Sequence, residues 1–315
     1  MPPQPRITAF VLAGGEGARL RPLTQDAPKP GLPFAGHCRI IDFVLANLQH
    51  SQVERVFVLL QYKPWVLLRH LHAHWPGVRP LLPADRFAGT ADAVAQALGR
   101  HATGRSEIVA VLAADHVYRM DLRQMASFHL RRRAGVTVAA AAVDAEAACQ
   151  FGVLRVDGES RITAFEEKPE RPCTIPGSPG RAYVSMGNYL FEPRLLAEVL
   201  ADLAHVEGLD FGHDVIPEVV RRQRAWAYDF RRNLVPGVRV TEEPGYWRDV
   251  GTLQAYRQAE QDAAGTSPRF ALDNPCWPVP PTLSTAAARA VPVQGPAMRP
   301  DPASAAAAAG AVRGP

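Results

Sequence analysis

The first half of the chain alternates short apolar runs with segments in which apolar residues recur at helical spacing. Three runs are almost wholly apolar and short enough to be buried strands: residues 7–13, 56–60 and 108–114. The spacing between them predicts three helices: residues 40–48, 65–74 and 90–101. Thr90 stands where it can cap the last helix. Such alternation is typical of βαβ units around a largely parallel sheet, which bind ligands at the carboxyl ends of strands.

In the second half the apolar pattern changes to shorter strands separated by turns. The predicted strands are residues 136–143, 153–156, 161–165 and 183–191. The predicted helices are residues 193–203, 214–222 and 252–263. We expect this half to cover one edge of the same sheet. The predicted fold is therefore α/β and Rossmann-like, with a mixed, mostly parallel sheet flanked by helices.

The composition changes abruptly at residue 284. Residues 284–315 are rich in Ala and Pro and contain no aromatic residue. Such a segment cannot bury enough apolar surface to offset the entropy lost on ordering. We therefore predict one folded domain over residues 1–283, followed by a disordered tail over residues 284–315.

Composition and charge narrow the class of protein. Of the 315 residues, 47% are hydrophobic and 21% are charged, which is typical of a soluble globular protein. The net charge of +4 is too small for a nucleic-acid-binding surface. The four cysteines are far apart with no CxxC pair, which argues against a disulfide framework and a zinc cluster. We expect reduced thiols and an intracellular protein.

Neither a signal peptide nor a membrane span is predicted. The apolar stretch after Arg6 has only about eight residues, too few for a signal sequence with its cleavage site. No run approaches the roughly 18 apolar residues of a membrane helix. The expected location is the cytoplasm.

The first predicted strand leads into a glycine-rich loop followed by basic residues. The relevant positions are Gly14, Gly15, Gly17, Arg19, Arg21 and Lys29. Glycines let backbone N–H groups approach a phosphate, and the cations neutralise it. The loop lacks the Gly-Lys-Ser/Thr of a P-loop, and Leu20 stands where a dinucleotide fingerprint needs its third glycine. It is either a third kind of phosphate loop or a tight turn.

Two aspartates and one acid–base pair follow predicted strands or precede a helix. Asp115 ends the apolar run 108–114, and Asp249 precedes the helix expected near Thr252. Each could cap a helix, or the two together could hold a Mg²⁺ ion that bridges substrate phosphates. Glu167 and Lys168 could be a solvated surface pair. The set as a whole contains the parts needed to bind two phosphorylated substrates with a metal.

The chain resembles the bacterial ADP-glucose pyrophosphorylases, the glucose-1-phosphate adenylyltransferases of glycogen synthesis within the sugar-nucleotidyltransferase superfamily. The glycine loop with Lys29-Pro30 is similar to the nucleotide loop of the superfamily. Segments similar to the ADP-glucose branch are residues 39–43 (RIIDF), 61–62 (QY), 89–93 (GTADA), 210–214 (DFGHD) and 246–252 (YWRDVGT). The likeness extends in unbroken order over roughly residues 7–283.

The resemblance implies a Rossmann-like nucleotidyltransferase fold and a reaction. Glucose 1-phosphate attacks the α-phosphate of ATP, giving ADP-glucose and pyrophosphate. The attacking phosphate oxygen is already ionised at pH 7, so catalysis rests on positioning and charge stabilisation rather than on a general base.

The resemblance also implies roles for individual residues. Gly14, Gly15 and Gly17 would donate backbone amides to the triphosphate. Arg19 would stabilise the leaving pyrophosphate, and Lys29 would contact phosphate. Asp115 and Asp249 correspond to the Mg²⁺-binding aspartates. In the sugar pocket, Glu167 would bind glucose hydroxyls and Lys168 the sugar phosphate, beside three lining residues: Ser185, Met186 and Gly187. Three further residues would face the adenine: Gln61, Gly89 and Thr90.

Several positions depart from the family pattern. Ala18 stands where a hydroxyl residue is usual, and Ala114 replaces the usual glycine before Asp115. The loop over residues 84–89 is shorter than in the family, with Phe87-Ala88 in place of a Tyr-Arg pair, which puts effector response in doubt. Family members also carry a C-terminal β-helix domain, where this chain has only residues 284–315. The partners expected are the two substrates and either a second copy of the chain or a full-length family member.

Two other patterns have plainer interpretations. His70, His72 and His74 alternate, but no acidic or sulfur ligand is near in sequence, so a solvated helix face is expected rather than a metal site. The arginine runs 131–133 and 221–222 stand at predicted helix C-termini, where cations offset the macrodipole.

Alternatives to the adenylyltransferase remain open at this stage. One is a nucleotidyltransferase for another base or sugar. Another is a non-catalytic subunit that binds nucleotide or sugar phosphate and modulates a partner. Ala18 and Ala114 favour the latter, whereas Arg19, Lys29, Asp115, Lys168 and Asp249 together oppose it.

Overall fold

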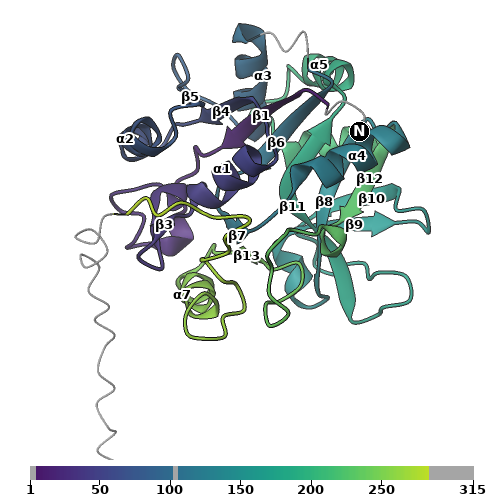
Figure 1. Ribbon diagram of the computed structural model, residues 1–315. Coiled ribbons are helices and arrows are strands. Elements are labelled where there is room, and N and C mark those ends of the chain that lie inside the picture. Colours follow the sequence, from purple (N-terminus) through teal and green to yellow (C-terminus); the bar gives the residue numbers. More distant parts are fainter. Residues whose placement is uncertain (1–4, 102–105, 284–315) are drawn as a thin grey trace, which may run out of the picture.

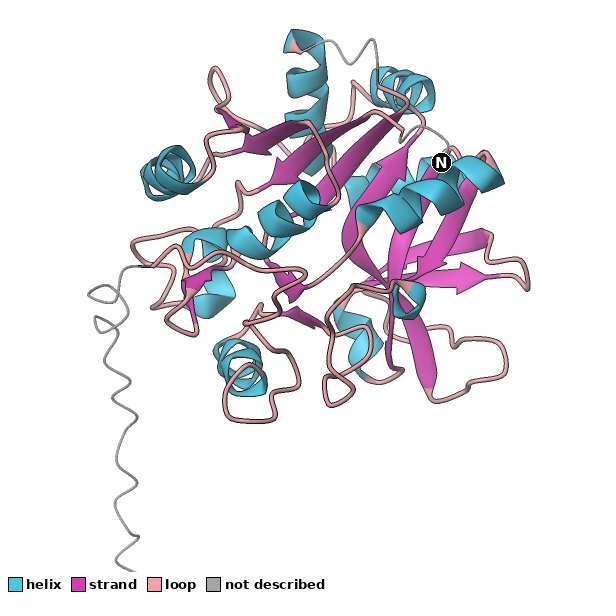
Figure 2. Ribbon diagram, in the orientation of Figure 1, coloured by secondary structure: helices cyan, strands magenta, loops and turns pink. Residues whose placement is uncertain are grey.

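In the computed structural model, which describes residues 5–101 and 106–283, helices cover both faces of one large sheet (Figures 1 and 2). The tail predicted over residues 284–315 lies outside the described residues. The expectation of an α/β fold with a mixed sheet flanked by helices is confirmed. No helix among the described residues is both long enough and apolar enough to cross a membrane.

The described part of the chain contains thirteen strands and seven α-helices, with a few short 3₁₀ and π turns. The strands are β1 (Ile7–Leu12), β2 (Pro33–Phe34), β3 (Cys38–Arg39), β4 (Arg55–Leu59), β5 (Val78–Leu81), β6 (Ile108–Ala113), β7 (His116–Tyr118), β8 (Val136–Asp144), β9 (Gly152–Val156), β10 (Ile162–Glu167), β11 (Arg181–Phe191), β12 (Ala225–Asp229) and β13 (Trp247–Asp249). The helices are α1 (Ile41–His50), α2 (Pro64–His74), α3 (Thr90–Arg100), α4 (Leu122–Arg132), α5 (Pro193–Asp202), α6 (Ile216–Arg221) and α7 (Leu253–Asp262).

The main sheet has nine strands, and its first half is parallel. Strands β6, β1, β4 and β5 run in that order and in one direction. Leu12 lies opposite both Ala113 and Leu59, so the three neighbouring strands end level with one another. The segments that follow them, which carry the glycine loop, Asp115 and Gln61, therefore emerge at the same edge of the sheet.

The second half of the chain extends this sheet, as expected. β11 pairs antiparallel with β6, and β8, β9, β10 and β12 continue from it. A separate two-stranded ladder joins β7 to β13 and places Asp249 opposite His116. This ladder brings residues more than 130 positions apart in the sequence to the edge where β1 and β6 end.

Two apolar cores lie on the two faces of the sheet because its central strands are buried on both sides. Ile7, Ala9 and Val11 of β1 pack with residues of α1, α2, α4 and α7. On the other face, Phe10 and Phe57 pack with residues of α3, α5 and α6, and their rings stack with centroids 5.4 Å apart. The alternating side chains of a strand thus supply both cores.

Helix α1 is buried, yet its polar side chains hold neighbouring segments in place. The side-chain amide of Asn47 donates to the carbonyl of Tyr118 at 3.3 Å. Its oxygen accepts from the backbone N–H of Met120 and from the indole N–H of Trp277, both at 3.0 Å. Asn47 therefore connects the end of β7 to the last segment of the described chain.

Asp42, also on α1, accepts hydrogen bonds from four groups and is completely buried. Its partners are the ring of His70 at 2.6 Å, the indole of Trp75 at 2.7 Å, the hydroxyl of Thr282 at 2.6 Å and the backbone N–H of Arg39 at 2.7 Å. The expectation of a solvated histidine face is therefore wrong for His70, which is 5% exposed. The sequence could not reveal this because Asp42 is 28 positions away.

Most predicted helices are found within one or two residues of their expected bounds, but one predicted cap is wrong. Thr90 begins α3 without capping it, and Gly89 occupies the N-cap position. The hydroxyl of Thr90 instead donates to Asp210 at 2.7 Å and accepts from the N–H of Phe211 at 3.1 Å. The Thr90 side chain thus bonds to residues distant in the sequence instead of capping its own helix. As expected, α4 and α6 end in arginines.

The role of Asn47 predicts a large loss of stability for Asn47→Ala. The substitution removes three buried hydrogen bonds and leaves their partners unsatisfied, so we expect the free energy of unfolding to fall by about 3 kcal/mol or more. Urea denaturation measures this. Gln49→Ala, on the exposed side of the same helix, is the control and should change stability by less than about 0.5 kcal/mol. Equal effects of the two substitutions would contradict the role given to Asn47.

Candidate active site

The glycine loop after β1 is shaped by one position that only glycine can fill. Gly17 has φ +70°, in the left-handed region, and a Cβ there would lie 2.8 Å from Cβ of Lys29. The carbonyl of Gly17 accepts from the hydroxyl of Thr24 at 3.0 Å, which ties the loop back on itself. The loop therefore holds Lys29 close against its own backbone.

Lys29 is buried between two carboxylates from distant parts of the chain. Its Nζ lies 3.0 Å from Asp115 and 2.7 Å from Asp249, and its side chain is 7% exposed. Burial lowers the pKa of Lys29, but the charges and hydrogen bonds of Asp115 and Asp249 outweigh it, and the net pKa is raised. The ammonium group is therefore charged at neutral pH and joins the segment after the glycine loop to the ends of β6 and β13.

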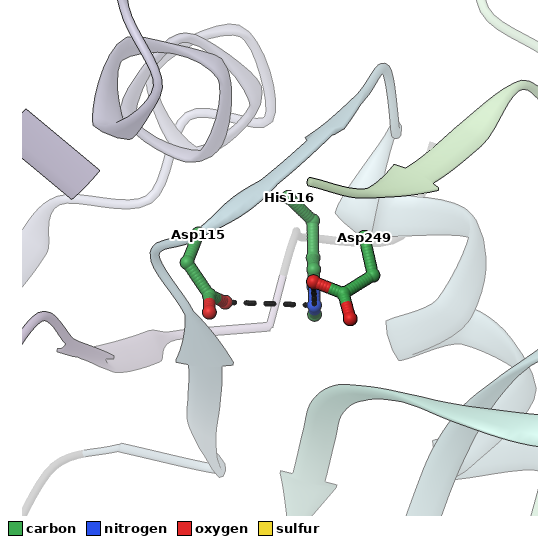
Figure 3. Close-up of side chains that lie close together, drawn as sticks. All are labelled: Asp115, His116 and Asp249. Atoms are coloured by element: carbon green, nitrogen blue, oxygen red, sulfur yellow. Dashed lines mark ion pairs between the residues drawn. The ribbon is translucent and has the colours of Figure 1, made fainter. Parts of the chain in front are cut away.

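Asp115 and Asp249 face each other with His116 between them (Figure 3). The Nε2 atom of His116 lies 3.5 Å from Asp115 and 3.8 Å from Asp249. Neither aspartate caps a helix, because β7 follows Asp115 and the hydroxyl of Thr252 caps α7. Of the alternatives left open by the sequence, the structure supports a charged cluster.

The pKa of Asp115 is held far below its ordinary value. Burial would raise it, but the electrostatic interactions with His116 and Lys29 and the hydrogen bond from Lys29 lower it to about 2. Asp115 is therefore ionised throughout the physiological range and available as an oxygen ligand. His116 was not among the residues expected from the sequence, although it stands directly after Asp115 in the same segment.

Glu167 and Lys168 lie where β10 ends, and Glu167 lines the same cavity as Asp115. Lys168 Nζ lies 2.5 Å from Glu167 Oε1. Two glycines leave room for the carboxylate of Glu167, because a Cβ on Gly152 or on Gly212 would come within 2.9 Å of its Oε2. Lys168 itself has φ +46°, an unfavourable conformation for a residue with a Cβ. The backbone here is strained where the sequence expects a sugar-phosphate contact.

Gly187 reaches the site through an irregularity in β11. The pairing of β11 with β8 shifts between Ser185 and Tyr189, and Gly187 has φ +67°. The hydroxyl of Ser185 accepts from the N–H of Gly187 at 3.1 Å and thus supports this bend. Met186 is completely buried. Of the three expected residues, Gly187 lines the cavity, whereas Ser185 and Met186 are not among the described residues that line it.

The side-chain amide of Gln61 is held by the backbone of Phe87. Gln61 Oε1 accepts from the N–H of Phe87 at 2.6 Å, and Nε2 donates to its carbonyl at 3.3 Å. Gly89 allows the carbonyls of Gly208 and Leu209 to come close, where any Cβ would collide with them. These contacts fix the short loop over residues 84–89 against the body of the domain.

These groups surround one cavity of about 530 Å³. Its walls include most of the expected residues: Gly14, Gly15, Gly17, Lys29, Gln61, Gly89, Thr90, Asp115, Glu167 and Gly187. Asp249 is adjacent to the cavity because it is paired with Lys29, which lines it. Arg19 lies beside Asp249: a Cβ built on Gly251 would be 3.1 Å from Arg19 Nη2 and 3.0 Å from Asp249 Oδ2. Asp210, Phe211 and Gly212 also line it, although no role was assigned to them from the sequence.

The donor set of the charged cluster fits a divalent cation. Asp115 and Asp249 supply carboxylate oxygens, and together with His116 they offer ligand atoms that all lie within 4.8 Å of one another. Oxygen ligands from one or two carboxylates, with the remaining positions left to water and phosphate, are typical of Mg²⁺. The nitrogen of His116 is a poorer ligand for that ion, so the two aspartates are the fitting pair.

Comparison with known proteins identifies the family to which the chain is similar. The model of the nucleotidyl transferase family matches residues 8–265. The glucose-1-phosphate adenylyltransferase of Thermodesulfovibrio yellowstonii is 43% identical over 88% of this chain and 71% of its own length. The enzymes of the same name from Geobacter metallireducens and Thermus thermophilus are also 43% identical, over 86% and 87% of this chain and 69% and 70% of their own lengths.

The matched range includes the positions of the glycine loop, the aspartate cluster and the Glu167–Lys168 pair. The resemblance inferred from the sequence motifs is confirmed by the family match and by the identity over most of the chain. The chain belongs to the nucleotidyl transferase family and, within it, to the glucose-1-phosphate adenylyltransferases.

Proposed function

We propose that this chain transfers the adenylyl group of ATP to glucose 1-phosphate, giving ADP-glucose and pyrophosphate, and that residues 1–283 form the catalytic unit. The observation that carries the proposal is the single cavity whose lining combines the glycine loop, the Lys29–Asp115 ion pair and Glu167. Its volume of about 530 Å³ is within the usual range for small-molecule sites. The names of the relatives agree with these substrates.

The chemistry of the two substrates decides what the protein must supply. The attacking phosphate oxygen of glucose 1-phosphate is ionised at neutral pH, so the reaction needs no general base. The difficulty is to bring two anions together and to stabilise the charge that leaves with pyrophosphate. Catalysis is therefore assigned to residues that position phosphates and balance their charge.

The glycine loop and two cations bind the triphosphate. The backbone N–H groups of Gly14, Gly15 and Gly17 face the phosphates, which glycine allows to come close. Arg19 stabilises the leaving pyrophosphate, and Lys29 contacts phosphate while its ammonium stays held by Asp115 and Asp249. Because that ammonium is already fixed, it loses little freedom when substrate binds.

Asp115 and Asp249 are the residues that would hold Mg²⁺. When bound, the ion supplies positive charge that lowers the repulsion between the α-phosphate and the sugar phosphate. Lys29 keeps the two carboxylates side by side, and the β7–β13 ladder fixes the strands from which they project. The low pKa of Asp115, about 2, keeps its oxygens free of protons.

The remaining residues orient the sugar and the base. Glu167 accepts hydrogen bonds from glucose hydroxyls, and Lys168 pairs with the sugar phosphate, with Gly187 lining the same pocket over Ser185 and Met186. Gln61 and the loop over residues 84–89, which includes Gly89, border the adenine together with Thr90. The contact between Gln61 and Phe87 makes that wall rigid.

The proposed reaction predicts nucleotide-selective release of pyrophosphate. Purified protein with Mg²⁺ and glucose 1-phosphate should release pyrophosphate with ATP and much less with UTP, dTTP, CTP or GTP. Asp115→Asn should lower kcat by a factor on the order of 10³, because it removes one charged ligand without changing shape. Asp144→Asn, at an exposed surface ion pair, is the matched control and should retain the original rate.

Two other results would redirect the assignment. Release with a different nucleotide at similar strength would show a nucleotidyltransferase of other specificity. No release with any nucleotide, from folded protein that binds ATP, would favour the non-catalytic, modulating subunit. An unchanged rate in Asp115→Asn would remove Asp115 from the mechanism.

The close approach of Gly212 to the carboxylate of Glu167 predicts that a substitution at Gly212 affects the KM for the sugar substrate selectively. In Gly212→Ala the new Cβ would lie 2.9 Å from Glu167 Oε2, so the carboxylate must shift. We expect KM for glucose 1-phosphate to rise roughly tenfold while KM for ATP changes little. In the control Gly158→Ala the Cβ meets nothing within 4 Å, and both constants should stay as they are. A rise confined to ATP would contradict the place given to Glu167.

A further inference from the structure

Strand β11 separates from its neighbour β6 at the point where it bends beside the catalytic cavity. The pairing of the two strands runs from Phe191 to Asn188, which lies opposite Leu112. The preceding residue, Gly187, has φ +67° and lines the cavity. A Cβ on Gly187 would lie 3.1 Å from that of Ala113, so the two strands remain close. The paired region nevertheless stops short of Ala113, the last residue of β6.

The side chain of Asn188 supplies the hydrogen bond that the backbone of the bent strand does not. Asn188 is completely buried, and its Oδ1 accepts from the backbone N–H of Ala113 at 3.2 Å. On the other side of β6, the N–H of Ala114 donates to the carbonyl of Leu12 in β1. Without the amide of Asn188, the N–H of Ala113 would lose the acceptor that holds the end of β6 against β11.

The same amide lies near the other end of the segment that carries Asp115. This segment, residues 113–118, extends from the end of β6 to Tyr118 in β7. The buried hydroxyl of Tyr118 has no hydrogen-bond partner among the described residues, but it lies close to the amide of Asn188. Burial raises the pKa of Tyr118, and the interaction with this amide opposes the rise. Asn188 is therefore next to both ends of the segment that presents Asp115 to the cavity.

Two contacts of different character act on the position of Asp115. The ion pair with Lys29 acts on the carboxylate itself, and its energy changes little with small displacements. The hydrogen bond to Asn188 acts on the backbone two residues earlier and is directional. The ion pair therefore attracts the carboxylate, whereas Asn188 fixes the end of the strand from which the carboxylate projects.

We propose that Asn188 is a positioning residue for adenylyl transfer. It allows β11 to bend at Gly187, where the cavity opens, while the end of β6 stays in place and holds Asp115 in position for the metal. Because Asn188 is completely buried, it acts through these two residues and not on a substrate. The inference rests on the proposed function. A misplacement of about 1 Å in an active site can lower a rate by a factor of about 100.

Substitutions that remove the acceptor test this role by steady-state kinetics. Asn188→Leu keeps the branching at Cγ but accepts no hydrogen bond, and Asn188→Ser is too short to reach Ala113 and does not crowd its surroundings. The second variant keeps the test available if the first fails to fold. In each folded variant we expect kcat to fall at least about tenfold and the Mg²⁺ concentration for half-maximal rate to rise about tenfold, because Asp115 is displaced.

Thr8→Val is the matched control for a loss of stability without a change at the site. Thr8 is completely buried near the opposite end of β1, and its hydroxyl is 2.6 Å from that of Ser106. The substitution removes a side-chain hydrogen bond, so urea denaturation should show a lower stability. Its kcat and its Mg²⁺ dependence should stay as in the original chain. An equal loss of kcat in Thr8→Val would show that Asn188 only stabilises the fold.

Electron paramagnetic resonance of Mn²⁺ measures metal binding without turnover. The dissociation constant of Mn²⁺ should rise about tenfold in the Asn188 variants and change by less than about a factor of two in Thr8→Val. Unchanged kcat and Mn²⁺ affinity in a folded Asn188 variant would overturn the proposal. If the original chain binds Mn²⁺ but releases no pyrophosphate, the proposed function fails while the Mn²⁺ comparison still tests Asn188. If it does neither, both proposals fail.

Discussion

The contact between Lys29 and the carboxylates of Asp115 and Asp249 is the one on which the geometry of the catalytic cavity depends. Without a cation between them, two ionised carboxylates at this distance would repel each other and separate. Lys29 is almost fully buried, so the attraction is screened less than at a surface, whereas Asp115 is 36% exposed and is partly screened. Because Asp115 follows β6 and Asp249 ends β13, the contact also connects the segment after the glycine loop to these two strands.

The positions of these three residues depend on helix α1, whose polar side chains lie within an apolar layer. The apolar residues of α1 fasten the helix to the sheet, but apolar contacts tolerate sliding. The hydrogen bonds from the backbone after β7 to Asn47 and to Ser51, which directly follows α1, are directional and limit such sliding. They determine where β7 lies, and β7 determines where β13 and Asp249 lie.

Most of the long elements were predictable from the sequence because their signals are local, although no bounds were predicted for α4. The buried strands are nearly continuous apolar runs, and α5 and α7 were found within a residue of their expected bounds. The ladder of β7 and β13 was not predictable, since each strand has three residues and its partner is about 130 positions away. For the same reason, three side-chain contacts could not be predicted from the sequence: Asp42 with His70, Thr90 with Asp210, and Arg119 with Glu242. In each pair, one residue gives no local sign of the other.

The charges of the proposed site are balanced before substrates arrive, and this constrains the mechanism. Four cations lie in or beside the cavity, Arg19, Lys29, Arg86 and Lys168, and so do four carboxylates, Asp115, Glu167, Asp210 and Asp249. ATP and glucose 1-phosphate together bring several further negative charges, which the chain alone does not offset. A divalent cation that arrives with the nucleotide would supply the missing charge, and the oxygens of Asp115 and Asp249 face the place where it is needed. A site already rich in uncompensated cations would bind the anions more tightly but would also retain the products.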